Sequence, residues 1–231
     1  SQTLIRKKVT HISLVPAQLK ELMEKPECIK RLKNYSAILV GGSSIPPALI
    51  EQALAAALPI HTTYGSSETA SQLFTACPQD LQKNANTTGR LLKFRKAKIA
   101  PDGEILAAGK TLFKGYVNAD GVASAVDDDG WFHTGDIGRI DENGLLFVTG
   151  RKDRMFISAG ENIYPEEIEK AIEGIVGVEC ALVQPVENEK FGKRPAAYVK
   201  MKNNKPPKPG EIQQELRKTL EGFKIPEIFP M

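Results

Sequence analysis

An acidic and a basic residue that could together hold a ligand rich in hydroxyl groups flank a short hairpin sequence. Asp136 ends the run Trp131-Phe132-His133-Thr134-Gly135-Asp136, and Arg151 follows Gly150. Residues 138–148 contain two short apolar runs around an Asn-Gly pair, which is typical of a β-hairpin and would bring Asp136 near Arg151. A carboxylate accepts hydrogen bonds from two hydroxyls while a guanidinium donates to their oxygens, so the pair suits a ribose. A surface salt bridge is the alternative for the pair taken alone.

A second group of chemically useful side chains lies in the loop Tyr64-Gly65-Ser66-Ser67-Glu68. A purine could stack on the ring of Tyr64, and the hydroxyl of Ser67 could donate to a phosphoryl oxygen. Glu68 could hold a divalent cation directly or through water. A helix start capped by Ser66 or Ser67 is the alternative interpretation, and the two are compatible.

A double glycine follows a short apolar strand earlier in the chain. Residues 37–40 are fully apolar, and Gly41-Gly42-Ser43 then leads into a helical pattern over residues 48–58. This order predicts a parallel α/β arrangement, in which ligands bind at the carboxyl ends of the strands. The two glycines would let the backbone approach a ligand closely, although a tight strand-to-helix turn is their commoner use.

The elements that position these residues fall into three successive parts. An α/β part has further strands at 9–15 and 59–63 and a helix after Pro16. An antiparallel β unit has short strands separated by Asp-Gly and Gly, at 88–91, 97–100, 101–106 and 112–116. A small α+β domain has strands at 155–158, 179–185 and 195–201 and helices at 165–173 and 211–220. We therefore predict an α/β fold with a large domain over 1–152, divided into 1–78 and 79–152, and a small domain over 153–231.

The bulk properties describe an ordinary globular protein. The chain has 231 residues, of which 41% are hydrophobic and 26% charged, and a net charge of +3. Basic residues such as Arg6, Lys7 and Lys8 are followed by a stretch in which lysines and glutamates alternate, so we expect a solvated helix face and no nucleic-acid partner. The Pro-rich loop 203–210 shows no sign of chemistry.

Cysteine usage and hydropathy point to the cytoplasm. Cys28, Cys77 and Cys180 are far apart and odd in number, which favours neither a disulfide framework nor a metal site and fits a reducing compartment. No apolar run approaches the roughly 20 residues that span a bilayer, and no secretory signal pattern is visible. We therefore expect a cytoplasmic protein without a membrane span, and a homo-oligomer is left open.

Several motifs, in order along nearly the whole chain, resemble signatures of the adenylate-forming enzymes, which include acyl-CoA synthetases, luciferases and peptide-synthetase adenylation domains. They are Tyr64 to Glu68, Gly103-Glu104-Ile105 with Phe113-Lys114-Gly115-Tyr116, Trp131 to Asp136, Gly150 to Asp153, and Gly160 to Glu169. Within this superfamily, Tyr64 to Gln72 and Phe191-Gly192-Lys193-Arg194-Pro195 are similar to the o-succinylbenzoate-CoA ligase family of menaquinone synthesis.

The resemblance implies an ATP-dependent acid:CoA ligase that acts through an acyl-adenylate, with a carboxylic acid, ATP and CoA as its small-molecule partners and magnesium as cofactor. Ser67 would touch the α-phosphate, and Glu68 would serve the magnesium ion. Tyr64 would stack on adenine, while Asp136 and Arg151 would hold the ribose. The remaining nucleotide-site residues that it implies are Gly41, Gly42, Ser43, Gly65 and Ser66.

The resemblance also implies a two-step enzyme with a mobile small domain. Asp153 matches the hinge about which that domain rotates between making the acyl-adenylate and transferring the acyl group to CoA. Gly160 would lie beside the pantetheine tunnel, and Phe223 with Lys224 would lie near the CoA nucleotide.

Parts of the family pattern are missing from the sequence. Nothing resembles the Ser/Thr/Gly-rich phosphate loop or the late lysine that binds the carboxylate and phosphate. We therefore expect the C-terminal half of a larger enzyme, trimmed at both ends and inactive alone. Ser67 replaces the commoner threonine but retains its hydroxyl. The alternatives are another aryl- or fatty-acyl-CoA synthetase, an adenylation domain that loads a carrier protein, and a non-catalytic nucleotide-binding module.

Overall fold

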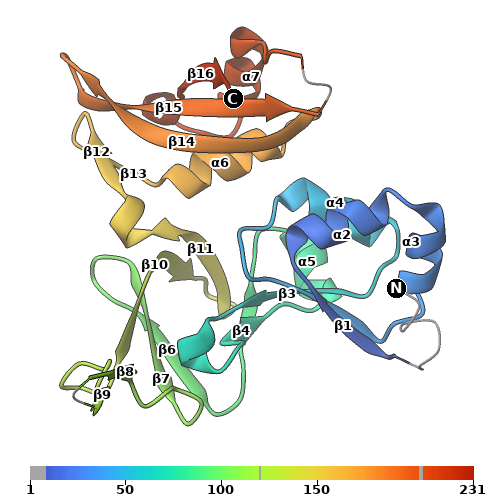
Figure 1. Cartoon of the computed structure of the whole chain (residues 1–231), viewed down its shortest axis with the longest axis vertical. Helices are drawn as coiled ribbons and strands as arrows, with labels where there is room; N and C mark the ends of the chain where they lie inside the picture. Colours follow the sequence, from blue (N-terminus) through green and yellow to red (C-terminus); the bar gives the residue numbers. More distant parts are fainter. Residues whose placement is uncertain (1–8, 120, 203–204) are drawn as a thin grey trace. The chain divides into compact units, whose positions relative to one another are not determined.

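The computed structural model describes residues 9–119, 121–202 and 205–231, which form two compact units (Figure 1). The first unit comprises Ser1–Thr134 and Gly138–Val148, and the second comprises Gly135–Ile137 and Thr149–Met231. Arg6, Lys7 and Lys8 of the predicted basic stretch lie outside the described residues, as do residues 203–204 of the Pro-rich loop.

A sheet of nine strands has the order β1-β2-β3-β4-β5-β11-β10-β7-β6. Its first three strands, β1 (His11–Leu14), β2 (Ala37–Val40) and β3 (Ile60–Tyr64), are parallel, and Ile38 of β2 pairs with Ile12 and Ile60. The carboxyl ends of parallel strands meet at one edge of a sheet, so the loops that follow β1, β2 and β3 converge. This is the parallel α/β arrangement that the sequence predicts.

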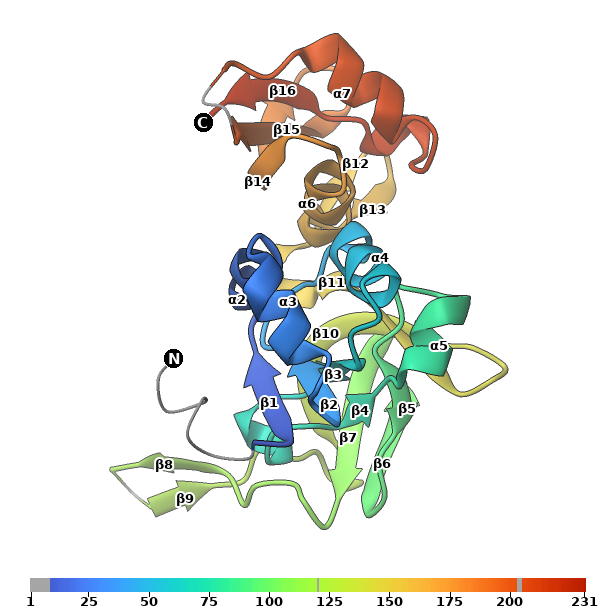
Figure 2. The ribbon, with the colours of Figure 1, turned by 90° about the vertical axis from the view of Figure 1, so that its right-hand side faces the viewer.

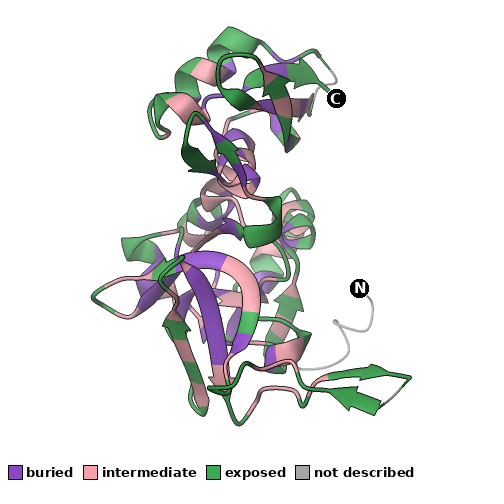
Figure 3. Cartoon of the chain, turned by 90° about the vertical axis from the view of Figure 1, so that its left-hand side faces the viewer, coloured by how far each residue is buried: buried purple, intermediate pink, exposed green. Residues whose placement is uncertain are grey.

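The rest of the sheet contains short strands and hairpins. Its members are β4 (Phe74–Thr75), β5 (Gly89–Leu91), β6 (Arg95–Ile99), β7 (Glu104–Gly109), β10 (Phe132–Ile140) and β11 (Leu145–Arg151). β10 and β11 are neighbours, and their turn is closed by a bond of 3.0 Å from Gly144 N to Asp141 O. The predicted hairpin around Asn143-Gly144 is therefore confirmed. A separate pair, β8 (Tyr116–Asn118) and β9 (Gly121–Ala123), is exposed along its length (Figure 3).

In the part of the first unit that the structure describes there are four helices, and each begins with proline in its first turn, where the missing N–H costs nothing. They are α2 (Pro16–Met23), α3 (Pro26–Leu32), α4 (Pro47–Ala55) and α5 (Pro78–Lys83). Figure 2 shows α2, α3 and α4 beside β1–β3. Leu19, Leu32 and Ile50 from these helices form one buried cluster with Ile38 and Ile60 of the strands.

The second unit is a small α+β module. It contains a turn η2 (Lys152–Arg154), the hairpin β12 (Phe156–Ser158) and β13 (Glu161–Ile163), α6 (Pro165–Glu173), β14 (Val178–Asn188), β15 (Gly192–Met201), α7 (Pro209–Leu216), a turn η3 (Gly222–Lys224) and β16 (Glu227–Pro230). The long strands β14 and β15 pair antiparallel, and β16 adds to β15 in parallel. Ile168 and Ile172 of α6 pack with Val183 and Ile212 in its core.

The predicted fold class is confirmed, but one predicted strand is wrong. Residues 112–115 are not a strand, and extended pairing starts only at Tyr116. The Phe113 ring instead packs edge-on against Phe132 at 5.4 Å, and its backbone N–H bonds Glu68 O at 2.8 Å. Tertiary contacts thus replace the strand ladder that the apolar run favours. The helices α3 and α5 and the strands β4 and β16 are not anticipated by the sequence patterns.

Two simple properties complete the description. Within the described ranges, no helix has both the length and the apolar character needed to cross a bilayer. Cys28, Cys77 and Cys180 are all free thiols.

Candidate functional site

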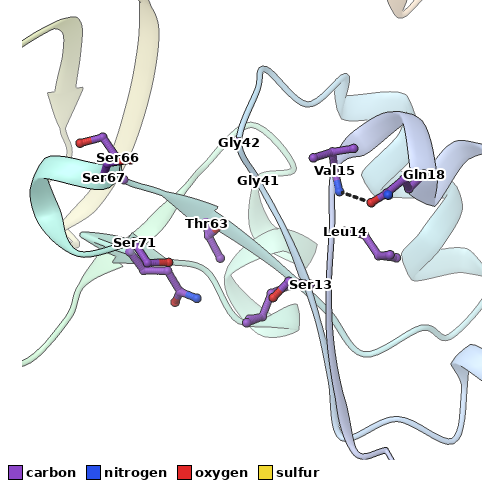
Figure 4. Close-up of a pocket in the computed structure, with 13 residues that line it drawn as sticks. Ser13, Leu14, Val15, Gln18, Gly41, Gly42, Thr63, Ser66, Ser67 and Ser71 are labelled. Atoms are coloured by element: carbon purple, nitrogen blue, oxygen red, sulfur yellow. Dashed lines mark hydrogen bonds between the residues drawn. The ribbon is translucent and has the colours of Figure 1, made fainter. Parts of the chain in front are cut away.

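A cavity of about 520 Å³ lies in the first unit, where the loops after β1, β2 and β3 converge (Figure 4). Residues that follow each of the three strands line it: Val15 and Gln18 after β1, Gly41 and Gly42 after β2, and Gly65, Ser66 and Ser67 after β3, with Ser13 and Leu14 of β1, Leu39, Thr63, Ser71 and Gln72 completing the wall. The backbone N–H of Val15 donates to Gln18 Oε1 at 3.1 Å and fixes one side of the opening. The sheet therefore gathers two predicted segments, Gly41-Gly42 and Gly65-Ser66-Ser67, around one cavity.

Gly41 is required by the close approach of two strands. A Cβ atom at this position would lie 2.1 Å from Thr63 Oγ1 and 2.8 Å from Thr63 O, which is closer than real Cβ contacts. Thr63 Oγ1 itself bonds Val40 O at 3.3 Å, so it is held in place. Ser43, the third predicted member of this segment, is exposed and is not among the residues that line the cavity.

The two serines follow β3 and Gly65 and lead into a single turn of 3₁₀ helix, η1 (Ser67–Thr69). Ser66 is the residue before the turn, and its backbone N–H donates to Thr69 Oγ1 at 3.0 Å. Thr69 is buried, so this bond anchors the turn while leaving Ser67 exposed. Ser66 thus occupies the predicted N-cap position, and Ser67 lines the cavity.

Tyr64 precedes this turn but is not among the cavity-lining residues. Its half-buried ring packs against Phe74, with the ring centres 6.4 Å apart and the planes inclined at 54°. The predicted stacking of adenine on Tyr64 stays a prediction.

Glu68 is held in an ionised, hydrogen-bonded state within the same turn. Bonds from the Ser66 hydroxyl, from its own backbone N–H and from Tyr116 lower the pKa of Glu68, although desolvation opposes them. Tyr116 donates to Glu68 Oε1 at 3.0 Å. The described residues contain no group of three or more His, Cys, Asp or Glu side chains placed to hold a metal ion. A carboxylate that shares a magnesium ion with substrate phosphates needs no such group, because Mg²⁺ is often held by only one or two carboxylates.

The second unit brings Asp136 and Arg151 together, as the hairpin argument predicts. Arg151 Nη1 lies 3.3 Å from Asp136 Oδ1, and the same guanidinium contacts Asp153 through Nε and Nη2, at 3.1 and 3.3 Å. The bonds with Asp153 are the main cause that raises the pKa of Arg151, whose charge is therefore permanent. Asp153 lies in η2 with 68% of its side chain exposed. One guanidinium thus serves two carboxylates, and both acids belong to the predicted site.

The predicted CoA contacts lie elsewhere in the second unit. Gly160 is exposed in the turn between β12 and β13, with a φ of +87°. Lys224 in η3 is 15% exposed and contacts Glu221 at 2.7 Å and Glu167 at 2.9 Å. Burial disfavours its charge, but these ion pairs outweigh burial and raise the pKa of Lys224. Arg194 donates to Phe223 O at 3.0 Å and so holds the backbone of the segment.

Sequence reasoning missed several residues that belong with the predicted ones. Gln18 and Val15 line the cavity because β1 is parallel to β2, a relationship that the strand pattern alone could have suggested. Tyr116 lies 48 positions from Glu68, and no local pattern links the two.

Sequence reasoning also missed His133, although this residue lies in the motif Trp131 to Asp136. Its Nδ1 lies 3.1 Å from Glu104 and its Nε2 lies 3.2 Å from Asp127. Glu104 is 4% exposed. Its hydrogen bond with His133 raises the pKa of His133 more than the bond with Asp127 does. In the first unit, His133 therefore ties β10 to β7 and to the loop before Trp131.

Comparison with known proteins gives a consistent result. The 2-succinylbenzoate–CoA ligase of Oceanobacillus iheyensis is 36% identical over 97% of this chain and 48% of its own length, and that of Bacillus subtilis is 34% identical over 97% and 47%. The structure of the o-succinylbenzoate CoA synthetase of Bacillus subtilis with the acyl-adenylate OSB-AMP has a TM-score of 0.86 at 32% identity, and covers all of this chain and 49% of that one. The chain therefore spans about half the length of the curated relatives it matches.

A more distant structure and a family model complete the comparison. The amide bond synthetase McbA of Marinactinospora thermotolerans has a TM-score of 0.87 and 24% identity, and the match covers all of this chain and 50% of the McbA chain. At this identity the match shows a shared fold alone. The model of AMP-binding enzymes matches residues 2–117, which is half of the 231 residues. Together with the cavity that the parallel strands form, this match shows that the chain belongs to the AMP-binding enzyme family.

Proposed function

We propose that this chain is part of an ATP-dependent acid:CoA ligase whose acid is o-succinylbenzoate. The observation that carries the proposal is the cavity at the carboxyl ends of β1, β2 and β3, lined by Ser66 and Ser67. It lies where nucleotides bind in open α/β sheets, and its wall contains the motif expected to touch the α-phosphate. The relatives that cover almost the whole chain carry the name 2-succinylbenzoate–CoA ligase, which supports the choice of acid.

The proposed reaction has two steps. In the first, a carboxylate oxygen of the acid attacks the α-phosphorus of ATP, the bond to the pyrophosphate oxygen breaks, and an acyl-adenylate forms. In the second, the CoA sulfur, which loses its proton, attacks the acyl carbon, and AMP leaves as the carbon–oxygen bond breaks. Hydroxyl and backbone donors around the phosphate stabilise charge that grows in the first step.

Particular residues of the first unit fit the first step. Ser67, exposed at the cavity wall, would donate to the α-phosphate, and Tyr64 would contact adenine. Glu68, kept ionised by Ser66 and Tyr116, would hold a magnesium ion that neutralises phosphate charge. The o-succinylbenzoate CoA synthetase of Bacillus subtilis has been solved with ATP and a magnesium ion, which supports this choice of cofactor.

Residues of the second unit fit ribose binding and the second step. Asp136 and Arg151, 3.3 Å apart, would hold the ribose hydroxyls. Asp153, in an exposed turn between β11 and β12, would supply the hinge. Gly160 would lie beside the pantetheine arm of CoA, with Phe223 and Lys224 near its nucleotide. The domain limits at residues 152 and 153 belong to this proposal, as do the cytoplasmic location and a homo-oligomer.

Exchange of labelled pyrophosphate into ATP tests the proposal, measured on a protein that has the full length of the relatives. Labelled pyrophosphate should enter ATP only when o-succinylbenzoate is present, and adding CoA should yield the thioester and AMP. If pyrophosphate exchange depends on a fatty acid or on another aryl acid and not on o-succinylbenzoate, the proposed acid is wrong but the proposed reaction stands. ATP binding without any acid-dependent exchange would favour the non-catalytic nucleotide-binding module and contradict the proposal.

A further inference from the structure

The hairpin β12–β13 is too small to hold its own position. Three residue pairs join its strands, from Phe156 with Ile163 to Ser158 with Glu161. It forms a two-stranded sheet of its own, and isolated two-stranded hairpins are marginally stable in water. Its inward side chains Phe156 and Ile163 join the module core, whereas Ile157 is 58% exposed. The position of Gly160 at its tip therefore depends on what fastens the two ends of the hairpin.

Among the described residues, one backbone hydrogen bond joins the tip to another element. Ala159 N donates to Phe191 O at 3.2 Å, and Phe191 lies in the connection between β14 and β15. The same carbonyl accepts a bond of 2.9 Å from Lys193 N. This shared carbonyl and the buried side chain of Ser158 hold the tip, and contacts at the base hold the opposite end of the hairpin.

The base is fastened by the side chain of Arg154, one residue after Asp153. Its Nη1 donates to Glu166 Oε1 at 2.9 Å, and its Nη2 donates to Glu169 Oε1 at 2.8 Å. Both carboxylates belong to α6, and their side chains are 17% and 15% exposed. Hydrogen bonds between ionised partners are shorter and stronger than neutral ones, so the short distances indicate a firm contact.

Glu169 extends this contact to the sheet. Its Oε1 also accepts a bond of 2.9 Å from Val183 N in the middle of β14. Arg154 therefore joins the start of β12 to α6 and, through Glu169, to β14. The bond with Glu169 is the main cause that raises the pKa of Arg154, a side chain that is charged at every physiological pH in any case.

Asp153 behaves differently from its neighbour. Its side chain contacts Arg151, two positions away at the end of β11, and is 68% exposed, whereas that of Arg154 is 38% exposed. The change from a local contact to a contact with the module core falls between these two residues.

We propose that Arg154 is a positioning residue that fixes the base of the β12–β13 hairpin and thereby sets the place of Gly160. The hairpin then moves with α6 and β14 as one body, and backbone motion at the joint is confined to residues 151–153. The part of this inference that concerns CoA rests on the proposed function, because it takes Gly160 as a contact of the pantetheine arm.

Amide hydrogen exchange on this chain tests the positioning role without any activity. Arg154→Met keeps most of the side-chain length but removes the charge and all donors, and should make amides of residues 156–163 exchange at least about threefold faster. Arg154→Lys should restore part of the protection. Lys200→Met, which removes the exposed pair of Lys200 with Glu179 in the same unit, is the matched control and should leave these amides unchanged.

The pattern of the exchange decides the outcome. Faster exchange confined to residues 156–163 supports the inference. Unchanged exchange in Arg154→Met overturns it, and so does equal acceleration across α7 and β15, which would make Arg154 a contributor to the stability of the whole unit only.

A second measurement on the full-length protein connects the role to catalysis. Arg154→Met should raise the KM for CoA by at least about threefold and lower acid-dependent pyrophosphate exchange by a smaller factor, because Gly160 serves only the second step. Equal losses in both steps would overturn the link to Gly160. The wild-type protein could show no ligase activity while amide hydrogen exchange follows the expected pattern. In that case the proposed function fails and the positioning role stands.

Discussion

The hydroxyl of Tyr116 on β8 donates a hydrogen bond of 3.0 Å to the carboxylate of Glu68, which lies in the turn after β3. Phe113 N also bonds Glu68 O at 2.8 Å, so side chain and backbone of Glu68 are both held by the same segment. A carboxylate held in this way stays ionised and keeps one orientation, which a ligand of Mg²⁺ requires. The segment 113–116 therefore matters for the proposed site although it lines no part of the cavity.

Two substitutions should separate the causes of the low Glu68 pKa. The bond from Ser66 is the largest contribution and that from Tyr116 the smallest of the three bonds, so Ser66→Ala should raise the Glu68 pKa more than Tyr116→Phe. Carboxyl carbon shifts followed during an NMR titration give the pKa directly. A larger rise in Tyr116→Phe would mean that the hydroxyl of Ser66 points elsewhere in solution.

Loss of the Asp136 carboxylate should weaken ATP binding. Asp136→Ala removes a partner of Arg151 and, under the proposed function, the acceptor for two ribose hydroxyls. Because a hydrogen bond to a charged group contributes roughly 1.5–3 kcal/mol, the KM for ATP in the full-length protein should rise at least about tenfold. Glu142→Ala, an exposed acid in the turn of the same hairpin, is the control. An unchanged KM in Asp136→Ala would leave this residue as a structural ion-pair partner.

The hinge assignment of Asp153 predicts a split between the two steps. Proline fixes φ, so Asp153→Pro should trap one arrangement of the joint while the side chains of both sites stay intact. Pyrophosphate exchange should remain substantial, whereas thioester formation from preformed acyl-adenylate and CoA should be mostly lost. Asp153→Ala, which keeps φ free, should retain both. Equal loss of the two steps together with a lower Tm would show that residue 153 is an ordinary structural position.

Stability should depend on pH through His133. Its pKa is raised by Glu104 and Asp127 above the ordinary 6.5, so its stabilising charge is fully present below pH 6.5 and is lost as pH rises through the folded-state pKa. The free energy of unfolding should therefore fall as pH rises above about 6.5 and through the folded-state pKa, and His133→Gln should flatten this fall. Urea unfolding at a series of pH values measures it, with His11→Gln as control. A fall of equal size in His133→Gln would assign the pH dependence to other groups.

A side chain at residue 150 should destabilise the protein as long as Glu166 stays in its present position. A Cβ atom on Gly150 would lie 2.6 Å from Glu166 Oε2 and 3.2 Å from Tyr164 Cβ. Arg154 holds the other oxygen of Glu166 at 2.9 Å, so the carboxylate cannot easily withdraw. Gly150→Ala should therefore lower the free energy of unfolding by about 1–3 kcal/mol, measured in urea.

A double substitution identifies the clash in Gly150→Ala. Glu166→Ala should lower the free energy of unfolding less in Gly150→Ala than in the wild-type chain. The reason is that the effects of substitutions at two clashing residues are not additive. Gly210→Ala, where a Cβ atom meets nothing within 4 Å, is the control and should not destabilise. Additive costs would place the strain at another contact.

Sequence reasoning succeeded where chemistry and local pattern coincide. The Asn143-Gly144 pair has the turn residues of a hairpin, and the hairpin alone places Asp136 beside Arg151. The apolar run 37–40 followed by two glycines indicates a buried parallel strand, and the structure has β2 there. In the first case the two residues lie 15 positions apart, and in the second the pattern is a run of adjacent residues, so the sequence displays both.

It failed where distant segments meet. Apolar residues at 112–116 favour a strand, but Phe113 is drawn into the core by Phe132 and its amide is taken by Glu68. The strand β16 is short and forms because β15 offers an edge with which it can pair. The residues of β16 alone do not indicate this pairing. The role of Arg154 depends on two acids of a helix that starts eleven positions later, and only the folded module shows that they converge.

The strand order of the large sheet has a consequence for how the protein folds as it is made. β1 to β5 lie side by side in the order of synthesis, so each new strand can add to the preceding one as it leaves the ribosome. The junction of β5 with β11, where Gly89 pairs with Leu146, must wait until the whole segment between them has been translated. Three donors bond Leu146 O at this junction, the hydroxyls of Thr87 and Thr88 and the amide of Thr88, so in the nascent chain they bond water until β11 arrives. A ribosome-bound chain ending before β11 should accordingly be the form most in need of a chaperone.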